Sequence, residues 1–363
     1  MKDQDAQKKI GMAVIGYGGM GSHHARKVYG ERPGKFDVVG VFDIREERQA
    51  LARKNGLEAF ESREALLSDP RIALVVVATP NDVHKEIVID ALRHGKNVIC
   101  EKPVTMASAD LEDMIAVANE CGRLFTVHQN RRWDPDYRTV KEIKESNTLG
   151  HMFHLESRVH GSRGIPGDWR NQKEHGGGML LDWGIHLLDQ MLQLMGPRRL
   201  LRLYAQLTNV TNENCDDGFR VYCTFEGATP AQGETTFLVE VLTSNFISLP
   251  RWYVLGENGS AVVRDWNRHG EIIKVSDWEN RECVPIQAGV GITKTMAPRD
   301  QKTIKKYKLP KPKCSWMEYY DNIFDVIRNG AAPIVTHDEQ RRLIRLVEAI
   351  FESDETGRVV EME

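Results

Sequence analysis

The chain of 363 residues has no long hydrophobic run and no excess of charge of one sign. Its longest aliphatic run, Ile72 to Ala78, is far shorter than the roughly 20 apolar residues that a membrane-spanning helix needs. Lysine and arginine total 49 against 52 aspartates and glutamates, which excludes a strongly basic nucleic-acid-binding protein. The first ten residues are polar and lack the apolar segment of a secretory signal. We therefore expect a cytoplasmic protein with no nucleic-acid partner and no membrane partner.

Clustered cysteines are also lacking. The six cysteines form no Cys-x-x-Cys pair and are scattered along the chain, so we expect free thiols in a reducing compartment. A catalytic cysteine is the alternative, and only Cys100 lies near a motif. With 41% hydrophobic and 28% charged residues, the composition is that of a globular protein, and the length corresponds to about two domains.

The first 130 residues alternate strand and helix signals. Short apolar runs predict strands, and the polar or amphipathic stretches between them predict helices. The predicted strands cover residues 12–15, 37–43, 72–78, 97–100 and 124–128, and the helices cover 19–29, 44–55, 81–95 and 107–121. Repeated strand–helix units with short links predict a parallel, doubly wound α/β sheet in domain 1–130.

The remainder of the chain, residues 131–363, has a different pattern. Apolar and polar residues alternate over 201–207, 219–225 and 237–241, which predicts antiparallel strands with one face covered by helices. A hairpin over 252–263, an excursion over 285–313 and two helices over 316–329 and 337–353 complete the expectation. We therefore expect a second α/β domain with a large, mostly antiparallel open sheet.

A glycine motif follows the first predicted strand. Gly16, Tyr17, Gly18, Gly19, Met20 and Gly21 fit G-x-G-x-x-G, with a helix signal behind them. Asp43 ends the second strand 22 residues later, where a carboxylate binds the ribose hydroxyls of NAD and repels a 2′-phosphate. Arg45 and Arg48 follow closely and are the argument for NADP, the less favoured cofactor. A glycine turn in a fold that has lost its cofactor is the alternative.

Two further strand ends carry polar residues. Ligands of an open α/β sheet bind at the carboxyl ends of its strands, so the loops at 79–81 and 101–103 are expected to face the nicotinamide. Lys102 is a candidate cation for a developing alkoxide. Besides the glycine motif, Asp43, Arg45 and Arg48, the expected cofactor-binding residues are Ile44, Thr79, Pro80, Asn81, His84, Glu101, Lys102 and Asn130.

A second polar cluster follows three consecutive glycines. Asp182, His186 and Asp189 are spaced by four and three residues, so on a helix they share one face beside an apolar stripe. A histidine can take a hydroxyl proton near neutral pH, and a carboxylate one turn away can tune it. A structural Asp–His pair is one alternative. A metal site that uses Asp182, His186 and the histidines at 151, 154, 160 and 175 is another, but no established ligand spacing is present, so we expect no metal.

Taken in order, these motifs resemble one family. The glycine motif, Asp43, Thr79-Pro80-Asn81 and Glu101-Lys102-Pro103 are followed by Asn130-Arg131-Arg132-Trp133-Asp134-Pro135, the Asp182-x-x-x-His186 helix and a Gly-Glu-Asn-Gly-Ser hairpin. This resembles the Gfo/Idh/MocA oxidoreductases, the family of glucose-fructose oxidoreductase and inositol dehydrogenase. The resemblance covers nearly the whole chain, and its motifs are specific only in combination.

The resemblance implies a Rossmann domain, a second α/β domain whose open sheet often mediates oligomers, and NAD(P)-linked oxidation of a ring hydroxyl. Lys102 matches the lysine that contacts the reacting hydroxyl. Asp182 and His186 match the inositol-dehydrogenase branch, where the histidine is the acid/base, whereas the glucose-fructose oxidoreductase branch has a tyrosine in place of His186. On this interpretation a substrate pocket is expected from Arg132, Trp133, His160, Trp169, Arg170, Asp182 and His186.

The expected function is transfer of a hydride between NAD and a ring carbon of a sugar, glycoside or cyclitol. Oxidation of a glucoside at position three is preferred over oxidation of an inositol. The enzyme alternatives are recycling of tightly bound NAD between two sugars and NAD-dependent cleavage of a glycosidic bond. An NAD- or sugar-binding regulator is the non-enzyme alternative, which the set Lys102, Asp182 and His186 argues against. A homo-oligomer, dimer or tetramer, is expected.

Overall fold

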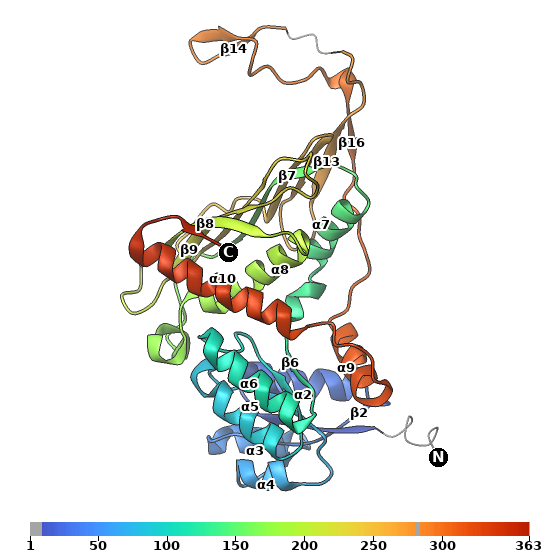
Figure 1. Ribbon diagram of the computed structural model, residues 1–363, viewed down its shortest axis with the longest axis vertical. Coiled ribbons are helices and arrows are strands. Elements are labelled where there is room, and N and C mark those ends of the chain that lie inside the picture. The colour runs from blue at the N-terminus through green and yellow to red at the C-terminus, as the bar shows by residue number, and fades with distance from the viewer. Residues whose placement is uncertain (1–8, 281–283, 363) are drawn as a thin grey trace.

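Two sheets and the helices between them make up the protein. The computed structural model describes residues 9–280 and 284–362. Figure 1 shows the N-terminal sheet and its helices at one end, then a layer of helices that includes α8 and α10, and then a second sheet whose other face carries no helix. The predicted fold class is therefore confirmed: a Rossmann-type parallel sheet followed by an α/β domain with a large open sheet.

The N-terminal sheet has six parallel strands in the spatial order β3-β2-β1-β4-β5-β6. The strands are β1 (Ile10–Ile15), β2 (Phe36–Phe42), β3 (Glu58–Ala59), β4 (Leu74–Val77), β5 (Asn97–Cys100) and β6 (Phe125–Val127). The helices that link them are α2 (Gly19–Glu31), α3 (Glu46–Lys54), α4 (Arg63–Ser68), the short η1 (Asn81–Val83), α5 (His84–Arg93) and α6 (Ser108–Cys121). Every residue of β4 is buried, as expected for a strand covered on both faces.

A helix from the far end of the chain also packs on this sheet. The ring of Phe36 in β2 lies against those of Tyr320 and Phe324 in α9 (Met317–Asn329), with centroids 5.7 and 6.0 Å apart. Asp321 of α9 forms ion pairs with Arg32 and Lys35, at 2.7 and 2.8 Å. Figure 1 shows α9 on the N-terminal side of the molecule. The strands of the two sheets lie on either side of residue 130 in the sequence, but α9, from beyond that residue, packs on the first sheet.

The second sheet has nine strands in the order β16-β13-β12-β11-β7-β10-β9-β8-β17. The strands are β7 (Met152–His160), β8 (Leu200–Thr208), β9 (Gly218–Phe225), β10 (Thr235–Leu242), β11 (Trp252–Gly256), β12 (Gly259–Val263), β13 (Gly270–Val275), β16 (Ile304–Tyr307) and β17 (Val360–Glu361). The longer helices of this part are α7 (Pro135–Glu145), α8 (Ile185–Met195), α9 and α10 (His337–Thr356). The short helical turns are η2 (Asn130–Trp133), η3 (Trp169–Asn171), η4 (Lys173–His175), the π-helix η5 (Leu180–Gly184) and η6 (Gln301–Thr303).

The central strand β7 is absent from the sequence-based expectation. It pairs parallel with β10, whereas every other pair in this sheet is antiparallel. The alternation of apolar and polar residues along β7 is easily overlooked. Its outward side chains are His154, Glu156, Arg158 and His160, and in the sequence they look like isolated polar residues. They form ion pairs with one another and with Glu240 of β10 on the open face of the sheet.

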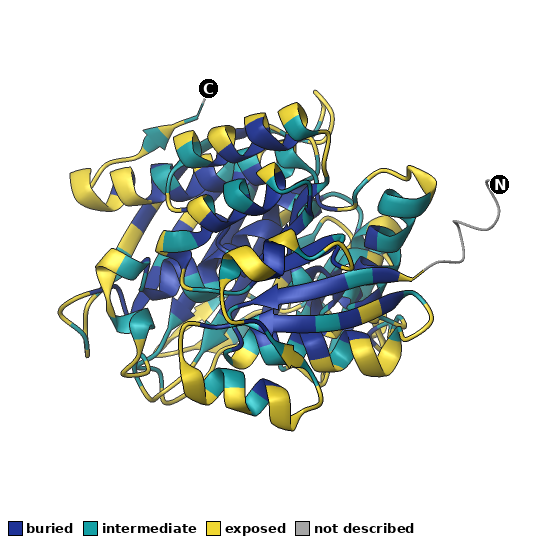
Figure 2. Ribbon diagram, turned by 90° about the horizontal axis from the view of Figure 1, so that it is seen from below, coloured by how far each residue is buried: buried dark blue, intermediate teal, exposed yellow. Residues whose placement is uncertain are grey.

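Helix α8 is more buried than its sequence suggests. The predicted apolar stripe is present, but Leu187, Met191 and Leu194, which lie off that stripe, are also buried. The reason is that α8 lies between the two sheets and has neighbours on all sides. Figure 2 shows the same distribution for the molecule: strands and inner helix faces are buried, and the outward faces of the peripheral helices are exposed.

Part of the predicted excursion is an arm that leaves the second sheet. Residues 304–307 form the edge strand β16, so the expectation of an irregular excursion over 285–313 is wrong there. Before β16, the strands β14 (Ile286–Ala288) and β15 (Gly291–Thr293) pair only with each other. Figure 1 shows this hairpin standing away from the body, beyond the face of the sheet that the helices leave open.

Two expectations about composition can be compared with the structure. None of the helices in the described part of the chain is both long enough and apolar enough to span a bilayer. Cys100, Cys121, Cys215, Cys223 and Cys314 are all free thiols, and Cys283 lies outside the described residues.

Candidate active site

The glycine turn between β1 and α2 leaves room for a ligand. Gly16 has φ +89°, and a Cβ there would lie 2.5 Å from the Ala78 carbonyl oxygen. A Cβ on Gly21 would lie 1.8 Å from the Gly16 carbonyl oxygen, so helix and strand approach closely only because both residues are glycine. Nothing lies within 4 Å of the Cβ positions of Gly18 and Gly19. The N-terminus of α2 is thus open to an anionic group such as a pyrophosphate.

Asp43 lies at the end of β2, beside this turn. Its side chain is buried, and it accepts hydrogen bonds from the backbone N–H groups of Tyr17 at 2.7 Å and Arg45 at 2.9 Å. Each carboxylate oxygen keeps a second lone pair for a ribose hydroxyl. Ile44 and Arg45 are exposed and Arg48 is partly buried. They follow the carboxyl end of β2, and the region outside the carboxyl ends of the strands, where an open α/β sheet binds its ligand, is called the crevice below. Two side chains of the glycine motif are not exposed. Tyr17 is buried and its hydroxyl accepts a hydrogen bond from Asn55, and Met20 is half-buried.

The substitution Asp43→Asn is expected to shift the cofactor preference toward NADP. The amide keeps the shape of the side chain but removes the negative charge that repels a 2′-phosphate. We expect the ratio of the dissociation constants for NADP⁺ and NAD⁺ to fall by about tenfold, which corresponds to about 1.4 kcal/mol. Isothermal titration with both nucleotides measures it, with Asp37→Asn, on the same strand, as control. An unchanged ratio would assign the preference to other residues.

The ends of β4 and β5 form the inner wall of the same crevice. Thr79 Oγ1 is buried without a hydrogen-bond partner, so a hydroxyl is available there. The ring nitrogens of His84 lie 3.0 Å from the carbonyl oxygens of Thr79 and Pro103, which ties the two loops together. The amide of Asn81 donates to the Gly176 carbonyl oxygen at 3.0 Å and holds the glycine loop. Pro80 is exposed, and Asn130 lies at the start of η2. The open glycine turn and the free Thr79 hydroxyl fit a dinucleotide.

Lys102 and Asp182 meet at the carboxyl end of β5. The ammonium of Lys102 lies 2.8 Å from the Asp182 carbonyl oxygen and 3.0 Å from its Oδ1. Arg170 Nε lies 3.5 Å from the other carboxylate oxygen. Burial by itself raises the pKa of Asp182, but the two cations outweigh it and hold that pKa below its usual value. The lysine is therefore a fixed cation at the edge of the sheet where ligands bind.

A break in helical geometry carries Asp182 toward this lysine. The residues Leu180–Gly184 form a π-helical turn before α8, a geometry that often occurs at functional sites. At its start, Asp216 accepts a hydrogen bond from the Leu180 N–H at 2.8 Å. Gly178 has φ +104°, and a Cβ there would lie 2.1 Å from Asp216 Oδ1. Burial raises the pKa of Asp216 to about 7. No pattern near Asp216 in the chain predicts its contact with Leu180, which is 36 residues away.

His186 is a buried histidine one turn after Asp182. Burial and the neighbouring charges of Lys102 and Arg131 lower its pKa well below the usual value, so the imidazole is neutral at neutral pH. Its Nδ1 is buried without a partner. Within the described residues no hydrogen bond joins Asp182 to His186, because the carboxylate is bound to Lys102 and Arg170 instead. The hydrogen bond by which Asp182 was expected to tune His186 is therefore absent from the described part of the chain.

Three expected substrate residues lie elsewhere. Arg132 is buried and forms ion pairs with Asp189 at 2.6 Å and Glu339 at 3.0 Å, and Trp133 is buried and donates to Glu318. Both therefore join α8, α9 and α10 rather than line a pocket. His160 contacts Glu240 on the open face of the second sheet, whereas α8 packs on the other face.

The remaining substrate candidates do come together. Arg170 reaches Asp182 and covers the ring of Trp169, with its guanidinium carbon 4.6 Å from the ring centroid. The sequence analysis missed Arg131, whose guanidinium lies 4.1 Å from the Trp183 ring centroid and influences both Asp182 and His186. Arg131 and Arg132 are adjacent in the short helix η2, and the sequence does not show that Arg132 is the one that faces Asp189.

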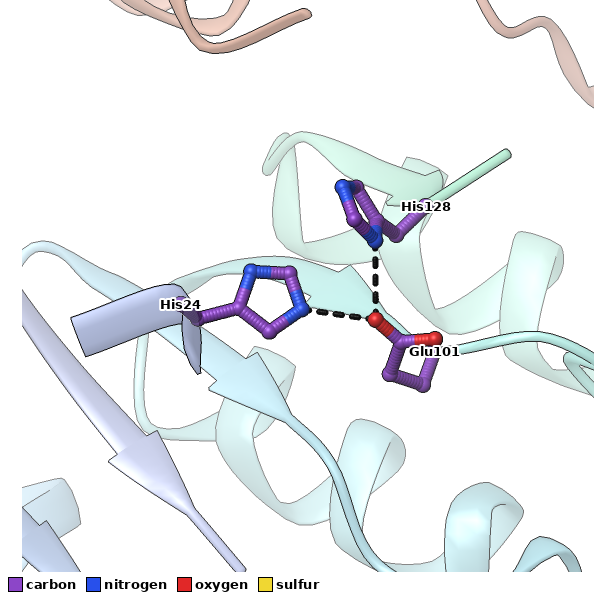
Figure 3. Close-up of side chains that lie close together, drawn as sticks. All are labelled: His24, Glu101 and His128. Carbon is purple, nitrogen blue, oxygen red and sulfur yellow. Dashed lines mark hydrogen bonds and ion pairs between the residues drawn. The ribbon is translucent and has the colours of Figure 1, made fainter. Parts of the chain in front are cut away.

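Glu101 belongs to a buried network below the lysine. Its Oε1 lies 2.6 Å from His24 Nε2 and 2.8 Å from His128 Nδ1 (Figure 3), and Oε2 accepts from the Lys102 backbone N–H at 3.3 Å. The other nitrogen of His24 bonds Tyr320 of α9. Although burial opposes ionisation, the two histidines hold the pKa of Glu101 well below its usual value. The carboxylate thus fixes the backbone of the catalytic candidate and does not face the cofactor crevice.

These three side chains are also the one place, among the described residues, where at least three potential metal ligands converge. Zinc at about 2.0–2.2 Å from each ligand would keep the ligand atoms about 3.3 Å apart. The observed separations of 2.6 and 2.8 Å are hydrogen-bond lengths. The cluster is better described as a hydrogen-bonded network. The histidines at 151, 154, 160 and 175 do not gather around Asp182 and His186.

We expect the protein to lose stability on mild acidification. His24, His84 and His186 have pKa values lowered by burial, so below about pH 6.5 the unfolded chain binds more protons than the folded one. Below about pH 6.5, each histidine that stays neutral in the folded protein lowers the free energy of unfolding by up to about 1.4 kcal/mol for each unit by which the pH falls. Because the pKa of Glu101 is also lowered in the folded protein, stability falls further once the pH drops below the usual pKa of a glutamate. The melting temperature, followed by fluorimetry from pH 7.5 to 5, should therefore fall.

A variant pair tests the cause. His24→Gln should flatten the pH dependence, whereas the exposed His269→Gln should leave it unchanged. Parallel curves for parent and His24→Gln would contradict the assignment.

The geometry defines a class of protein: a dinucleotide-binding sheet whose carboxyl edge meets a fixed lysine and a neutral histidine is typical of NAD-dependent oxidoreductases. Residues 10–129 match the family model of the oxidoreductase family with an NAD-binding Rossmann fold, and residues 137–262 match the GFO/IDH/MocA C-terminal domain. The chain belongs to the GFO/IDH/MocA oxidoreductases, and its N-terminal domain is an NAD-binding domain.

Relatives cover the whole chain. A solved NAD-binding protein from Listeria innocua is 47% identical with a TM-score of 0.92, covering 98% of this chain and 100% of that one. The scyllo-inositol 2-dehydrogenase (NADP(+)) IolW of Bacillus subtilis is 26% identical over 98% of this chain and 96% of its own length. The D-glucoside 3-dehydrogenase of Escherichia coli is 30% identical over 54% of this chain and 57% of its own.

Proposed function

We propose that the protein oxidises a ring hydroxyl group of a sugar, glycoside or cyclitol with NAD⁺. The observation that carries the proposal is the placement of Lys102 beside Asp182 at the carboxyl end of β5, next to a neutral His186. A fixed cation and a neutral base are what removal of a hydroxyl proton requires. The relatives named as scyllo-inositol 2-dehydrogenase and D-glucoside 3-dehydrogenase support this substrate class.

Each residue has a role in this proposal. His186 accepts the hydroxyl proton, because its lowered pKa keeps the imidazole free of a proton at neutral pH. Lys102 stabilises the forming alkoxide, and Asp182 holds the ammonium in place with Arg170 on its far side. Trp169, Arg170 and Arg131 provide an aromatic face and donors for a polyol. NAD⁺ held at the glycine turn would supply the redox chemistry, as the acceptor of a hydride.

Two substrates are the leading candidates. We prefer a glucoside oxidised at position three, to give a keto-sugar. Inositol is the second candidate, because IolW matches nearly the full length of both chains. The same site geometry also serves an enzyme that holds NAD tightly and recycles it between two sugars, or that cleaves a glycosidic bond through transient oxidation.

Absorbance at 340 nm separates these outcomes. The protein is mixed with glycosides, free sugars and inositols, each with and without added NAD⁺ or NADP⁺. Steady growth with one substrate class and NAD⁺ supports the dehydrogenase and identifies the substrate. A single burst equal to the enzyme concentration, without added cofactor, supports tightly held NAD. No reduction with any compound, by protein shown to bind NAD⁺, would overturn the proposed oxidation.

We also propose that the protein is a homo-oligomer, a dimer or tetramer, that buries the open face of its second sheet. Tyr204 and Tyr222 are direct neighbours on β8 and β9 and are exposed on this face, as is Tyr253 on β11. Exposed aromatic residues in such a patch are typical of interaction surfaces.

A further inference from the structure

The arm, defined here as residues 284–300, carries the hairpin that stands away from the body of the described chain (Figure 1). Its two strands form a separate two-stranded sheet. Its hydrogen bonds include one from Gln287 to the Gly289 carbonyl oxygen, within the arm, and one from Arg299 to the Asp277 carbonyl oxygen, in the segment between β13 and the arm. An isolated two-stranded hairpin is only marginally stable in water. Because no third strand joins β14 and β15 in the described part of the chain, this hairpin would gain stability from a second surface.

Several of the exposed side chains of the arm are apolar. Val290 is fully exposed, and Ile292 and Met296 are 75% and 77% exposed. Val284, at the start of the arm, is 75% exposed. Four large apolar residues gathered in one projecting segment are unusual for a surface that stays in water, where exposed hydrophobic residues are normally scattered singly. The segment has the composition of a contact that is buried against another body.

The open face of the second sheet indicates which body that is. Its charged side chains compensate one another: Glu240 pairs with Arg220 and His160, and Glu156 pairs with Arg158. Arg158, Glu240 and His160 are each less than 10% exposed in their side chains although they lie on an outward face. Because these charges are paired, the face has no excess charge that would attract a strongly charged partner of the opposite sign. A face that carries balanced pairs of both signs beside exposed tyrosines is self-complementary, which suits a second copy related by a two-fold axis.

The arm and the open face lie on the same side of the molecule. The arm leaves the sheet edge at β13 and β16 and rises on the side away from the helices (Figure 1). A second copy that docks on the open face would therefore lie within reach of the arm. A fully extended chain from Ser276 to Gly289 spans at most about 45 Å. That is somewhat more than the width of a nine-stranded sheet, about 38 Å at the usual strand spacing.

We propose that the arm crosses to a second copy of this chain, docked on the open sheet face, and buries Val290, Ile292 and Met296 on it. The two-fold axis makes the exchange reciprocal, so each copy both gives and receives an arm. This inference rests on the oligomer proposed above and is independent of the proposed reaction. Its contacts lie at the end of the molecule opposite the dinucleotide-binding sheet of the same chain.

The test compares assembly in three variants of the full chain. The arm variant carries Val290→Asp, Ile292→Asp and Met296→Asp, the face variant carries Tyr222→Asp, and the control carries Tyr29→Asp on α2, away from both. Light scattering and analytical ultracentrifugation over a concentration series give the dissociation constant of the oligomer. We expect the arm variant and the face variant each to raise it by at least 100-fold and the control to leave it unchanged. The melting temperature of the monomeric fraction shows that each variant is folded.

The other outcomes overturn the inference in distinguishable ways. A monomeric parent would overturn both the oligomer and the arm exchange. An oligomeric parent whose dissociation constant is unchanged in the arm variant would overturn the arm exchange alone. Weakening by the arm variant but not by the face variant would show that the copy docks elsewhere. NAD⁺ reduction measured on the same samples reports separately on the proposed function.

Discussion

Replacement of Lys102 by methionine is expected to lower kcat by about 10²- to 10³-fold, the usual loss when one preorganised group at a developing oxyanion is removed. Methionine keeps the length of the side chain but removes the ammonium that lies 3.0 Å from Asp182 Oδ1. The dissociation constant for NAD⁺ should change by no more than about twofold, since the glycine turn and Asp43 are untouched. Initial rates at 340 nm and a nucleotide titration give the two quantities.

Lys85→Met is the matched control for this result. Lys85 is a surface lysine whose ammonium lies 2.6 and 2.7 Å from Asp110 and Asp113, so it also forms two ion pairs but outside the crevice. Its loss should leave kcat within about twofold of the parent. If Lys102→Met kept more than a tenth of the parental kcat, the lysine would not be the group that stabilises the alkoxide.

Replacement of His186 by asparagine is expected to lower kcat by about 10²- to 10⁴-fold, the range for loss of a general base. Asparagine retains a polar side chain of similar size but cannot accept a proton at neutral pH. The variant should still bind NAD⁺, because His186 lies on the helix that packs between the sheets and not on the glycine turn.

The pH profile distinguishes a base from a structural residue. The base form of His186 must be present for reaction, and its pKa is lowered by burial and by Lys102 and Arg131. The acidic limb of kcat/KM in the parent should therefore lie well below pH 6.5, with a flat profile through neutral pH. In His186→Asn the limb should disappear, whereas in the surface variant His94→Gln it should persist. A limb of unchanged midpoint in His186→Asn would assign it to another group.

The sequence predicted those parts of the site that depend on neighbours along the chain. The glycine turn, Asp43, Lys102 and the Asp182–His186 spacing are local patterns, and each lies at a strand end or helix start, where local sequence dictates the backbone. The parallel order of the first sheet follows for the same reason, since each helix links strands that are close in sequence.

The parts that were not predicted depend on partners far away in sequence. Arg132 is withdrawn from the crevice by Asp189 and Glu339, and nothing beside it in the chain announces those partners. His160 is placed on the open face by the register of β7 against β10. Arg131 was missed because one residue decides which side of η2 faces the site. The π-helical turn changes which atoms Asp182 can reach, whereas the spacing of Asp182, His186 and Asp189 predicts a shared face only for a regular α-helix.

The position of α9 has a consequence for how the protein is made. The face of the first sheet that carries Phe36 is covered by Tyr320 and Phe324, which leave the ribosome only after nearly three hundred further residues. The same helix supplies the Tyr320 hydroxyl to the buried His24–Glu101–His128 network. The first domain to be synthesised is thus completed only when α9, near the end of the chain, has been made. Until α9 arrives, the nascent chain carries an apolar surface and an unfinished polar cluster, which makes this interval the natural point of action for a chaperone.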